Sequence, residues 1–455
     1  MERSPTAAAP LSAADTAPPA TPVFSNGYRR YAMGVILTIA TLNLVDRYVI
    51  NILAEPIRNE LNLLDWQIGA LSGFAFALFY TFLGLPIARY AEVGHRPRII
   101  ATAVVVWSGF TALCGLAQSF TFLVLMRIGV GVGEAGCTPP SHSLVVDYAP
   151  PEKRASALAL FGMGAPLGGM LGMAIGGLVA DWLGWRAAFF VCAVPGILAG
   201  IVAALTLVEP RNRPDHPAAL AHATPGVGWR EALRILSAKP TFWPLGLGIA
   251  LTAFISYGHG PFTASFFFRI HGPEVAATAA SLGLEAAGFL GIVLGLMSGI
   301  GGITGVLLGG WLADRRALTD KRAYIDIPAW AALASIPVYT VALLAPSVPS
   351  ALGLLVLYQI LGALQMGPVF AAAMSIAPPR LRATASAIIL FQVSLIGLGI
   401  GPVSVGALSD YLAIGQGMGA GEGIRWALIA STFVALFAFW LYRRASRTMI
   451  GDLEG

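Results

Sequence analysis

The sequence predicts an all-α polytopic membrane protein whose twelve transmembrane helices form two pseudo-symmetric six-helix bundles. Of the 455 residues, 56% are hydrophobic and only 11% are charged, whereas a soluble domain carries about 25% charged residues. Hydrophobic runs of 18 or more residues recur along the chain, and runs of this length can cross a bilayer. An internal repeat divides the runs into two sets.

The hydrophobic runs define twelve spans, separated by short polar or Gly- and Pro-rich stretches. The first six lie at about 29–53, 66–91, 98–117, 120–147, 153–182 and 186–208. The other six lie at about 241–270, 283–313, 322–345, 348–375, 380–411 and 423–443. We therefore expect bundles at 29–208 and 241–443, joined by a connection at 209–240, with a disordered tail at 1–28 and a second tail at 444–455.

The placement of lysine and arginine predicts that both termini are cytoplasmic, in a bacterial inner membrane or its equivalent. With this orientation, 22 of the 28 basic residues lie in the tails and cytoplasmic loops, as is typical of multi-pass proteins. Four lie outside, namely Arg58, Arg186, Arg269 and Arg425. The net charge of +5 follows from this topology, so it does not indicate a nucleic-acid partner. In the 209–240 connection, Trp229, Leu233 and Leu236 recur at helical spacing, which favours a short helix on the membrane surface over a partly ordered linker.

The two sets of spans are related by an internal repeat. A-P-P-E-K-R-A-S at 149–156 matches A-P-P-R-L-R-A-T at 377–384. Further matches lie 229 residues apart, pairing Gly168, Gly172, Gly177 and Asp181 with Gly397, Gly401, Gly406 and Asp410. Duplicated halves around a central site are common among transporters. The fifth span also carries a ladder of small residues at Gly164, Gly168, Gly172 and Gly176, and we expect it to pack closely on a helix of the opposite half.

Four ionisable residues lie inside spans, where each costs roughly 2.5–3.5 kcal/mol on insertion scales. They are Asp46, Arg47, Arg127 and Glu134. Helical rise places Asp46 about 24 Å along the first span. It places Arg127 about 10 Å and Glu134 about 21 Å along the fourth span, which runs inward. Arg127 is therefore near the level of Asp46, and the two arginines are the available counter-charges for the two acids.

The functional hypothesis for these four residues is proton coupling. A carboxylate in a low-dielectric cavity tends to bind a proton, whereas a nearby guanidinium favours the charged form. A substrate or movement that withdraws the arginine would therefore switch protonation. We assign coupling to Asp46 and Glu134, with Arg47 and Arg127 as counter-ions or contacts for an anionic head group. The alternative is a static ion network that fixes helix packing.

Other polar and aromatic residues are candidates for the lining of a substrate cavity. They are Thr138, His142, Tyr80, Tyr257, His259 and Phe266. Two of them, Thr138 and His142, flank the kink expected at Pro139 and Pro140. The alternative for His142 is a hydrogen-bonded packing residue, and most aromatic residues in such spans face lipid or other helices. No spacing of the three cysteines indicates a metal site or a disulfide framework.

Several motifs resemble those of known transporters. G-W-L-A-D-R at 310–315, and more loosely A-R-Y-A-E-V at 88–93, resemble a loop motif of the major facilitator superfamily. N-L-V-D-R-Y at 43–48 and R-I-G-V-G-V-G-E-A at 127–135 resemble the Spinster family, which is associated with transport of sphingosine-1-phosphate and lysophospholipids. The resemblance implies a major facilitator fold over 29–443. It also implies a cytoplasmic gate containing Glu92, Asp314 and Arg315, although Val93 departs from the motif.

These observations predict a secondary active transporter that works by alternating access, and not an enzyme. The chain has no G-x-x-x-x-G-K-[ST] motif for ATP, so a proton gradient is the expected energy source and no cofactor is expected. By resemblance the substrate is an amphipathic anionic lipid such as a lysophospholipid or a sphingoid phosphate. The alternative is a carrier of small organic anions or drugs. Membrane lipids are the other expected partners, and we expect the chain to function as a monomer.

Overall fold

The computed structural model describes residues 24–212 and 229–454, and every regular element in these ranges is a helix. The first half contains α1 (Asn26–Leu61), α2 (Asp65–Gly69), α3 (Ala75–Val93), α4 (Arg96–Cys114), α5 (Phe120–Glu134), α6 (Thr138–Tyr148), α7 (Arg154–Gly162) and α8 (Gly164–Thr206). A π-helical turn, η2 (Ala70–Phe74), joins α2 to α3. Two short 3₁₀ turns, η3 (Pro151–Lys153) and η4 (Pro210–Asn212), complete this half.

The connection contributes α9 (Trp229–Ser237) before the second half begins. The second half contains α10 (Phe242–Ile270), α11 (Gly272–Ser281), α12 (Ala286–Leu296), α13 (Gly302–Ala317), α14 (Ala323–Leu343), α15 (Val348–Ala363), α16 (Met366–Ile376), α17 (Arg382–Gln392), α18 (Gly401–Asp410), α19 (Gly419–Thr432) and α20 (Val434–Glu454). Shorter turns link them, namely η6 (Met297–Gly301), η7 (Pro379–Leu381), η8 (Val393–Ile400) and η9 (Tyr411–Gly415).

The described helices account for twelve membrane spans. Ten helical segments are long and apolar enough to cross a bilayer by themselves, and one of these covers 156–212. That segment is two spans, because its chain reverses direction at Gly184, where φ is 81°. These segments therefore give eleven spans. The remaining one is α10, which follows α9 after a bend of 94°. The predicted all-α fold is therefore confirmed.

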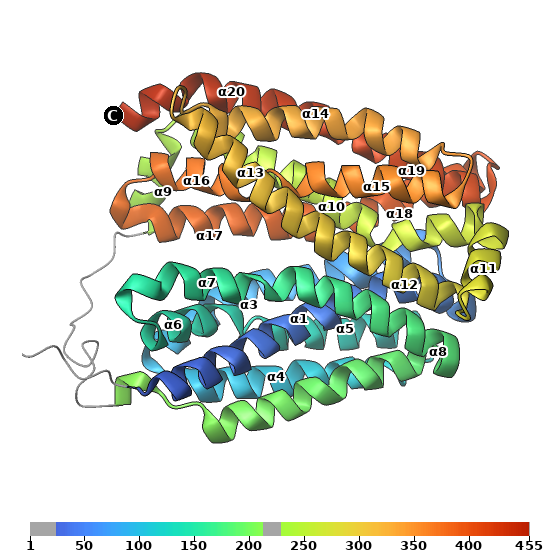
Figure 1. The fold of residues 1–455 in the computed structure, drawn as a ribbon, viewed down its shortest axis with the longest axis horizontal. Coiled ribbons are helices and arrows are strands. Elements are labelled where there is room, and N and C mark those ends of the chain that lie inside the picture. Colours follow the sequence, from blue (N-terminus) through green and yellow to red (C-terminus); the bar gives the residue numbers. More distant parts are fainter. Residues whose placement is uncertain (1–23, 213–228, 455) are drawn as a thin grey trace, which may run out of the picture.

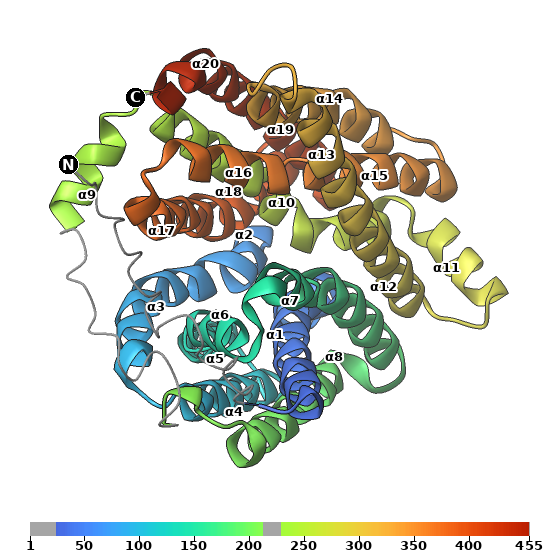
Figure 2. The same cartoon turned by 60° about the vertical axis from the view of Figure 1, so that its left-hand side comes forward.

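The helices form two groups that lie side by side along their length (Figure 1). Figure 2 shows α1 and α3–α8 in one group and α10–α20 in the other. We call the end of the molecule where α1 begins and α20 ends the terminal end, and the opposite end, where α1 ends and α11 lies, the far end. The last helix continues to Glu454, past the predicted end of the twelfth span, whereas most of the predicted 1–28 tail lies outside the described residues.

The apolar cores show how the halves are joined. One core combines buried residues of both halves, such as Val49, Leu53, Phe262 and Leu290, toward the far end. The other two large cores belong almost entirely to one half each. Burial of apolar surface is the main force that holds such elements together, so the halves are stably packed toward the far end.

The helix predicted in the connection is present as α9. Leu236 is fully buried and Leu233 partly buried in the core of the second half, while Arg230 and Arg234 are exposed. After this helix, Lys239 and Thr241 bond to Asp452 of α20 at 2.7 and 2.9 Å. The apolar face of α9 therefore packs on protein. The side chain of Trp229 and residues 213–228 lie outside the described part of the chain.

The glycine ladder packs against a different helix from the one predicted. A Cβ added at Gly168 would lie 2.5 Å from the carbonyl oxygen of Thr41, and one at Gly172 would lie 2.7 Å from that of Val45. Both neighbours belong to α1, in the same half. The prediction of a partner in the opposite half was wrong for this ladder, because helical spacing shows which face is smooth and not what lies against it.

The opposite half is met instead by the repeat-related pair Gly177 and Gly406. A Cβ at Gly177 would overlap the carbonyl oxygen of Ala287, and one at Gly406 would overlap that of Asp65. At these two positions the backbones of the halves approach so closely that a side chain has no room. The halves therefore touch through equivalent surfaces, α8 against α12 and α18 against α2.

We expect Gly406→Ala to loosen the far end. Overpacking by one methyl group costs about 1–3 kcal/mol, so spin labels on the exposed positions Leu64 and Ile414, next to α2 and α18, should show a longer, broader distance distribution. The control is Gly353→Ala, because a Cβ at Gly353 meets nothing within 4 Å. An unchanged distance in Gly406→Ala would contradict this account of the contact.

Candidate functional site

The four charged residues inside the spans come together between α1 and α5. Nη2 of Arg47 lies 2.5 Å from Oε2 of Glu134, and the side chains are 14% and 0% exposed. The predicted meeting of these helices is therefore present, with Arg47 as the direct partner of Glu134. Ion pairs in so buried a position are costly to break, since removal of one partner leaves the other charge uncompensated.

The other acid and base contact one another differently. Thr111 donates a hydrogen bond to Oδ2 of Asp46 at 3.2 Å, while Oδ1 has no partner among the described residues. Arg127, which is fully buried, donates to the backbone carbonyls of Asp46 at 3.3 Å and Leu71 at 3.2 Å. Arg127 thus lies at the level of Asp46, as the helical rise predicts, but forms no ion pair with it within 4 Å among the described side chains. Asp46 is held by a neutral hydroxyl.

An aromatic pair of α3 supports the guanidinium of Arg47. Its carbon lies 4.6 Å from the ring centroid of Phe76 and 5.2 Å from that of Tyr80, and the two rings stack at 5.3 Å. A cation over an aromatic face is attracted by the ring quadrupole. Tyr80, one of the predicted lining residues, therefore contributes by positioning Arg47.

A cavity of about 130 Å³ lies between the two halves. Among the described residues that form its wall, Arg47 is the one charged residue. From the first half the wall also includes Tyr48, Asn51, Ser72 and Met173. From the second half it includes Ser256, Tyr257, Gly260, Pro261, Thr263, Leu294, Met297, Ser298, Tyr339, Leu355, Tyr358, Gln359 and Leu398. The cavity therefore presents one cationic group among hydroxyl, amide, aromatic and aliphatic groups.

The other predicted lining residues lie in three places. Tyr257 is part of the cavity wall, while His259 lies behind it, bonded to Tyr358 at 2.9 Å. Phe266 is fully buried in the apolar core that the halves share. Thr138 and His142 lie on α6, and His142 lines a separate pocket with Ser143, Val146, Asp147 and Leu158. Sequence reasoning missed the wall residues of α14 and α15, since single tyrosines in apolar helices give no distinctive pattern.

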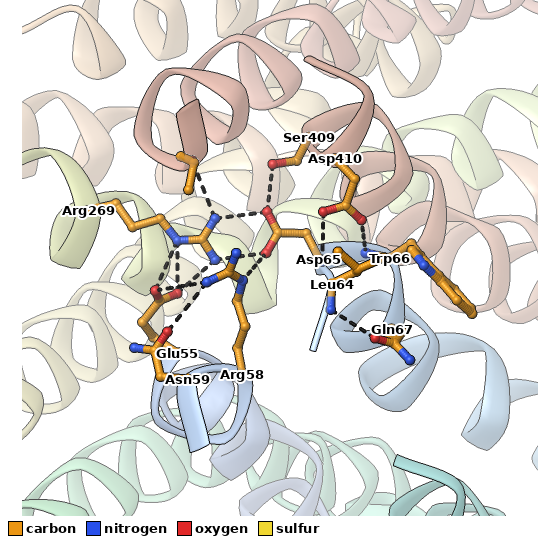
Figure 3. A network of polar contacts seen from close by, with 11 residues as sticks. Glu55, Arg58, Asn59, Leu64, Asp65, Trp66, Gln67, Arg269, Ser409 and Asp410 are labelled. Atoms are coloured by element: carbon orange, nitrogen blue, oxygen red, sulfur yellow. Dashed lines mark hydrogen bonds and ion pairs between the residues drawn. The ribbon is translucent and has the colours of Figure 1, made fainter. Parts of the chain in front are cut away.

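A network of charges joins the halves at the far end (Figure 3). Arg269, at the end of α10, donates from Nε to the Glu55 carboxylate at 3.0 Å and from Nη1 and Nη2 to the Asp65 carboxylate at 2.8 Å. Asp65 also accepts a hydrogen bond from Ser409 at 2.6 Å and pairs with Arg58 at 3.0 Å. We call these five residues the Arg269 clamp. The sequence placed Arg58 and Arg269 on this side, but the acids that meet Arg269 are more than 200 residues away in the chain.

Two aspartates cap helices of the opposite half in the same manner. Asp181 accepts hydrogen bonds from the backbone N–H groups of Ala287 at 3.1 Å and Gly288 at 2.5 Å, at the start of α12. Asp410 accepts from the first two N–H groups of α2 at 3.0 and 2.8 Å (Figure 3). An acid at a helix N-terminus satisfies unpaired N–H groups and interacts favourably with the helix dipole. Because Asp181 and Asp410 are equivalent in the internal repeat, we call these contacts the reciprocal caps.

Two of the three predicted gate residues, Asp314 and Arg315, make contacts within one half at the terminal end. Asp314 accepts a hydrogen bond from Tyr324 at 2.8 Å, and Arg315 lies 5.4 Å from the ring centroid of Trp311. The side chain of Glu92 lies outside the described residues. Every hydrogen bond and ion pair found between described groups of the two halves is at the far end. This arrangement of the molecule is thus closed at the far end.

Comparison with known proteins places this arrangement in a family. The model of the Major Facilitator Superfamily matches residues 36–402. The chain belongs to the major facilitator superfamily. It is an integral multi-pass membrane protein and a transporter, not an enzyme.

Three relatives refine this assignment. An MFS-type efflux pump of Mycolicibacterium smegmatis is 34% identical over 420 residues, which are 91% of this chain and 93% of that protein. The solved structure of a bacterial homolog of the human lysosomal transporter Spinster, inward-facing and unoccupied, is 33% identical with a TM-score of 0.81, covering 94% of this chain and 99% of that one. A hexuronate transporter of Bacillus subtilis is 27% identical over 60% of this chain and 61% of its own length. The predicted resemblance to the Spinster family is confirmed.

Proposed function

We propose that this transporter couples the movement of an amphipathic anion to a proton gradient. The observation that carries the proposal is the position of Arg47, whose guanidinium is part of the cavity wall and is also bound by the fully buried Glu134. An anion that binds Arg47 competes with Glu134 for the same guanidinium. A buried carboxylate that loses its counter-ion is strongly disfavoured unless it takes up a proton. Binding of the anion at Arg47 and binding of a proton at Glu134 are thereby linked.

Asp46 is the second proposed proton site. It is buried against α4 with one neutral donor and no paired guanidinium, so its charged form has little compensation. Arg127 bonds the backbone of the same residue, which makes it the group that a helix movement would bring onto, or take away from, the carboxylate. In this proposal Arg127 supports the proton sites from within the first half, and Arg47 contacts the substrate.

The substrate that we propose is an anionic lipid of the lysophospholipid or sphingoid phosphate class. Arg47 would hold the phosphate, and the aliphatic wall formed by Met173, Leu294, Met297 and Leu355 would contact the start of the chain. The likeness to a bacterial Spinster homolog supports this class. A small organic anion is the second candidate, favoured by the amides and hydroxyls of Asn51, Gln359 and Thr263 in the same wall and by the likeness to a hexuronate transporter.

We further propose that the terminal end faces the cytoplasm, with the protein acting as a monomer in a bacterial inner membrane. The excess of lysine and arginine in the tails and in the loops at that end supports this orientation. The far-end closure described above would then correspond to a state open toward the cytoplasm. In the state closed to the cytoplasm, the gate residues Glu92, Asp314 and Arg315 would join the halves.

The test is transport by the purified protein in liposomes with an imposed pH gradient. We expect uptake of radiolabelled lysophosphatidic acid to rise about tenfold with the gradient, equivalent to about 1.4 kcal/mol of driving force, and to fall when a protonophore collapses it. Gluconate supplied in parallel tests the second candidate. Uptake that ignores the gradient would overturn coupling, and uptake of gluconate without lysophosphatidic acid would replace the proposed lipid by a small anion.

A further inference from the structure

Two tyrosines of the second half form part of the cavity wall, whereas the charged residues belong to the first half. Tyr339 of α14 and Tyr358 of α15 both line the cavity, and their ring centroids lie 4.3 Å apart. Tyr339 is 1% exposed. His259 of α10 stacks on Tyr339 with centroids 4.5 Å apart and planes 9° from parallel. The three rings therefore fix one another in place.

Hydrogen bonds behind the wall determine what Tyr358 offers to the cavity. Ser431 lies 2.9 Å from the carbonyl of Leu428 and 3.0 Å from Nε2 of His259. A carbonyl can only accept, so the Ser431 hydroxyl gives its hydrogen to Leu428 and accepts from Nε2–H of a neutral His259. Nδ1 of that ring then carries no hydrogen, and Tyr358, 2.9 Å away, donates to it. With its own hydrogen used, the oxygen of Tyr358, a residue of the cavity wall, is left as an acceptor.

Tyr339 offers the complementary group. Its hydroxyl is buried and has no hydrogen-bond partner among the described residues. A buried hydroxyl without a partner is costly and rare in folded proteins. One neighbour of this hydroxyl in the wall is Thr263, whose own hydrogen goes to the carbonyl of His259 at 2.9 Å. Because the ring lines the cavity, a bound molecule can accept the Tyr339 hydrogen. The wall therefore presents a donor from Tyr339 beside an acceptor from Tyr358.

We propose that Tyr339 and Tyr358 form a subsite for a hydroxyl group of the substrate. A hydroxyl can accept from Tyr339 and donate to Tyr358 at the same time, whereas a methylene would leave the Tyr339 hydroxyl without an acceptor and the Tyr358 oxygen, already bonded to His259, without a donor. The inference rests on the proposed function, since it assigns the neutral part of the anion whose charge Arg47 holds. Glycerol-based lysolipids, sphingoid phosphates and sugar acids all carry such a hydroxyl, so the subsite could bind a molecule of any of these classes. His259 and Ser431 act as positioning residues, because they orient Tyr358 without lining the cavity.

The test compares two matched pairs of ligands in nanodiscs. One pair is oleoyl lysophosphatidic acid and its deoxy analogue, and the other is 2-hydroxyhexanoate and hexanoate. We expect the wild type to bind the hydroxylated member of one pair about 10- to 100-fold more tightly, as one unmade buried hydrogen bond implies. Tyr339→Phe should remove most of this preference, and the pair that shows it identifies the source as lipid or small acid. Equal dissociation constants within both pairs, or a preference that survives both Tyr339→Phe and Tyr358→Phe, would overturn the inference.

Two controls separate this result from a structural effect and from the proposed function. Tyr339→Phe deletes an unpartnered oxygen, so its melting temperature should equal or exceed that of the wild type, which a structural role for the hydroxyl would not allow. Tyr442→Phe deletes a buried hydroxyl outside the cavity, bonded to Gln365 at 2.9 Å, and should keep the ligand preference. Arg47→Ala should weaken binding of all four ligands; if it does not, the proposed function is wrong while the hydroxyl preference stands.

Discussion

Glu134→Gln should abolish gradient-driven uptake while tightening the binding of the anion. An amide cannot take up the proton, so accumulation should fall to the level seen without a gradient. The same change frees Arg47 from its carboxylate, which now holds it at 2.5 Å. A charge-assisted hydrogen bond contributes about 1.5–3 kcal/mol, so the apparent affinity for the anion should rise about 10- to 100-fold. Flux in proteoliposomes and binding in nanodiscs measure the two effects separately.

The matched control is Glu60→Gln, which alters another carboxylate of α1. Glu60 pairs with Arg186 and accepts from Trp185 at 2.6 Å, away from the cavity, so its loss should leave the gradient dependence intact. Asp46→Asn should reduce coupling without tightening the anion, because Asp46 does not hold Arg47. Full gradient-driven uptake in both Glu134→Gln and Asp46→Asn would overturn the role of the two acids.

Removal of both reciprocal caps should open the far end. Asp181→Ala and Asp410→Ala each delete two hydrogen bonds from a carboxylate to backbone N–H groups. At about 1.5–3 kcal/mol for each charge-assisted bond, either change should raise the population open at the far end by at least about tenfold. The caps share no residues, so we expect the effects of the two changes to be roughly additive.

Thiol labelling measures this opening. A cysteine in place of Ser72, which is buried in the cavity wall, should react faster with an impermeant reagent applied from the far side when the caps are missing. The three native cysteines are buried and are replaced beforehand. Asp320→Ala serves as the control, since Asp320 bonds locally to Arg322 at the terminal end. Equal labelling rates in wild type and double variant would show that the caps do not hold the halves together.

The sequence was sufficient for the fold and for the membership of the charged site, but not for its pairing. Charges inside spans are few, and helical rise puts them at comparable depths, so Asp46, Arg47, Arg127 and Glu134 were identifiable together. Which guanidinium meets which carboxylate depends on helix rotation and side-chain direction, and the sequence does not determine these. Arg127 was an available counter-charge for either acid, but in the structure it donates to backbone carbonyls.

Contacts between distant segments were beyond sequence reasoning for a related reason. The repeat identified Asp181 and Asp410 as equivalent, yet nothing in a single sequence says that an aspartate at a helix end caps a helix of the other half. The Arg269 clamp joins residues more than 200 positions apart. Tyr339 and Tyr358 are ordinary members of apolar helices until the fold brings both into the cavity wall.

The reciprocal caps make the contact between the halves resemble the isologous interface of a two-fold dimer, in which each partner gives the same group that it receives. Asp65 and Ala287 hold equivalent places in this interface, because each offers the first backbone N–H to the opposite aspartate. Of these two residues, only Asp65 has a carboxylate, and this carboxylate forms an ion pair with Arg269. The two contacts therefore have the same geometry, but the contact of α2 with α18 is the stronger one. We expect the halves to separate first where α8 contacts α12, which is the weaker contact. The contact of α2 with α18, which the Arg269 clamp reinforces, would then act as the hinge.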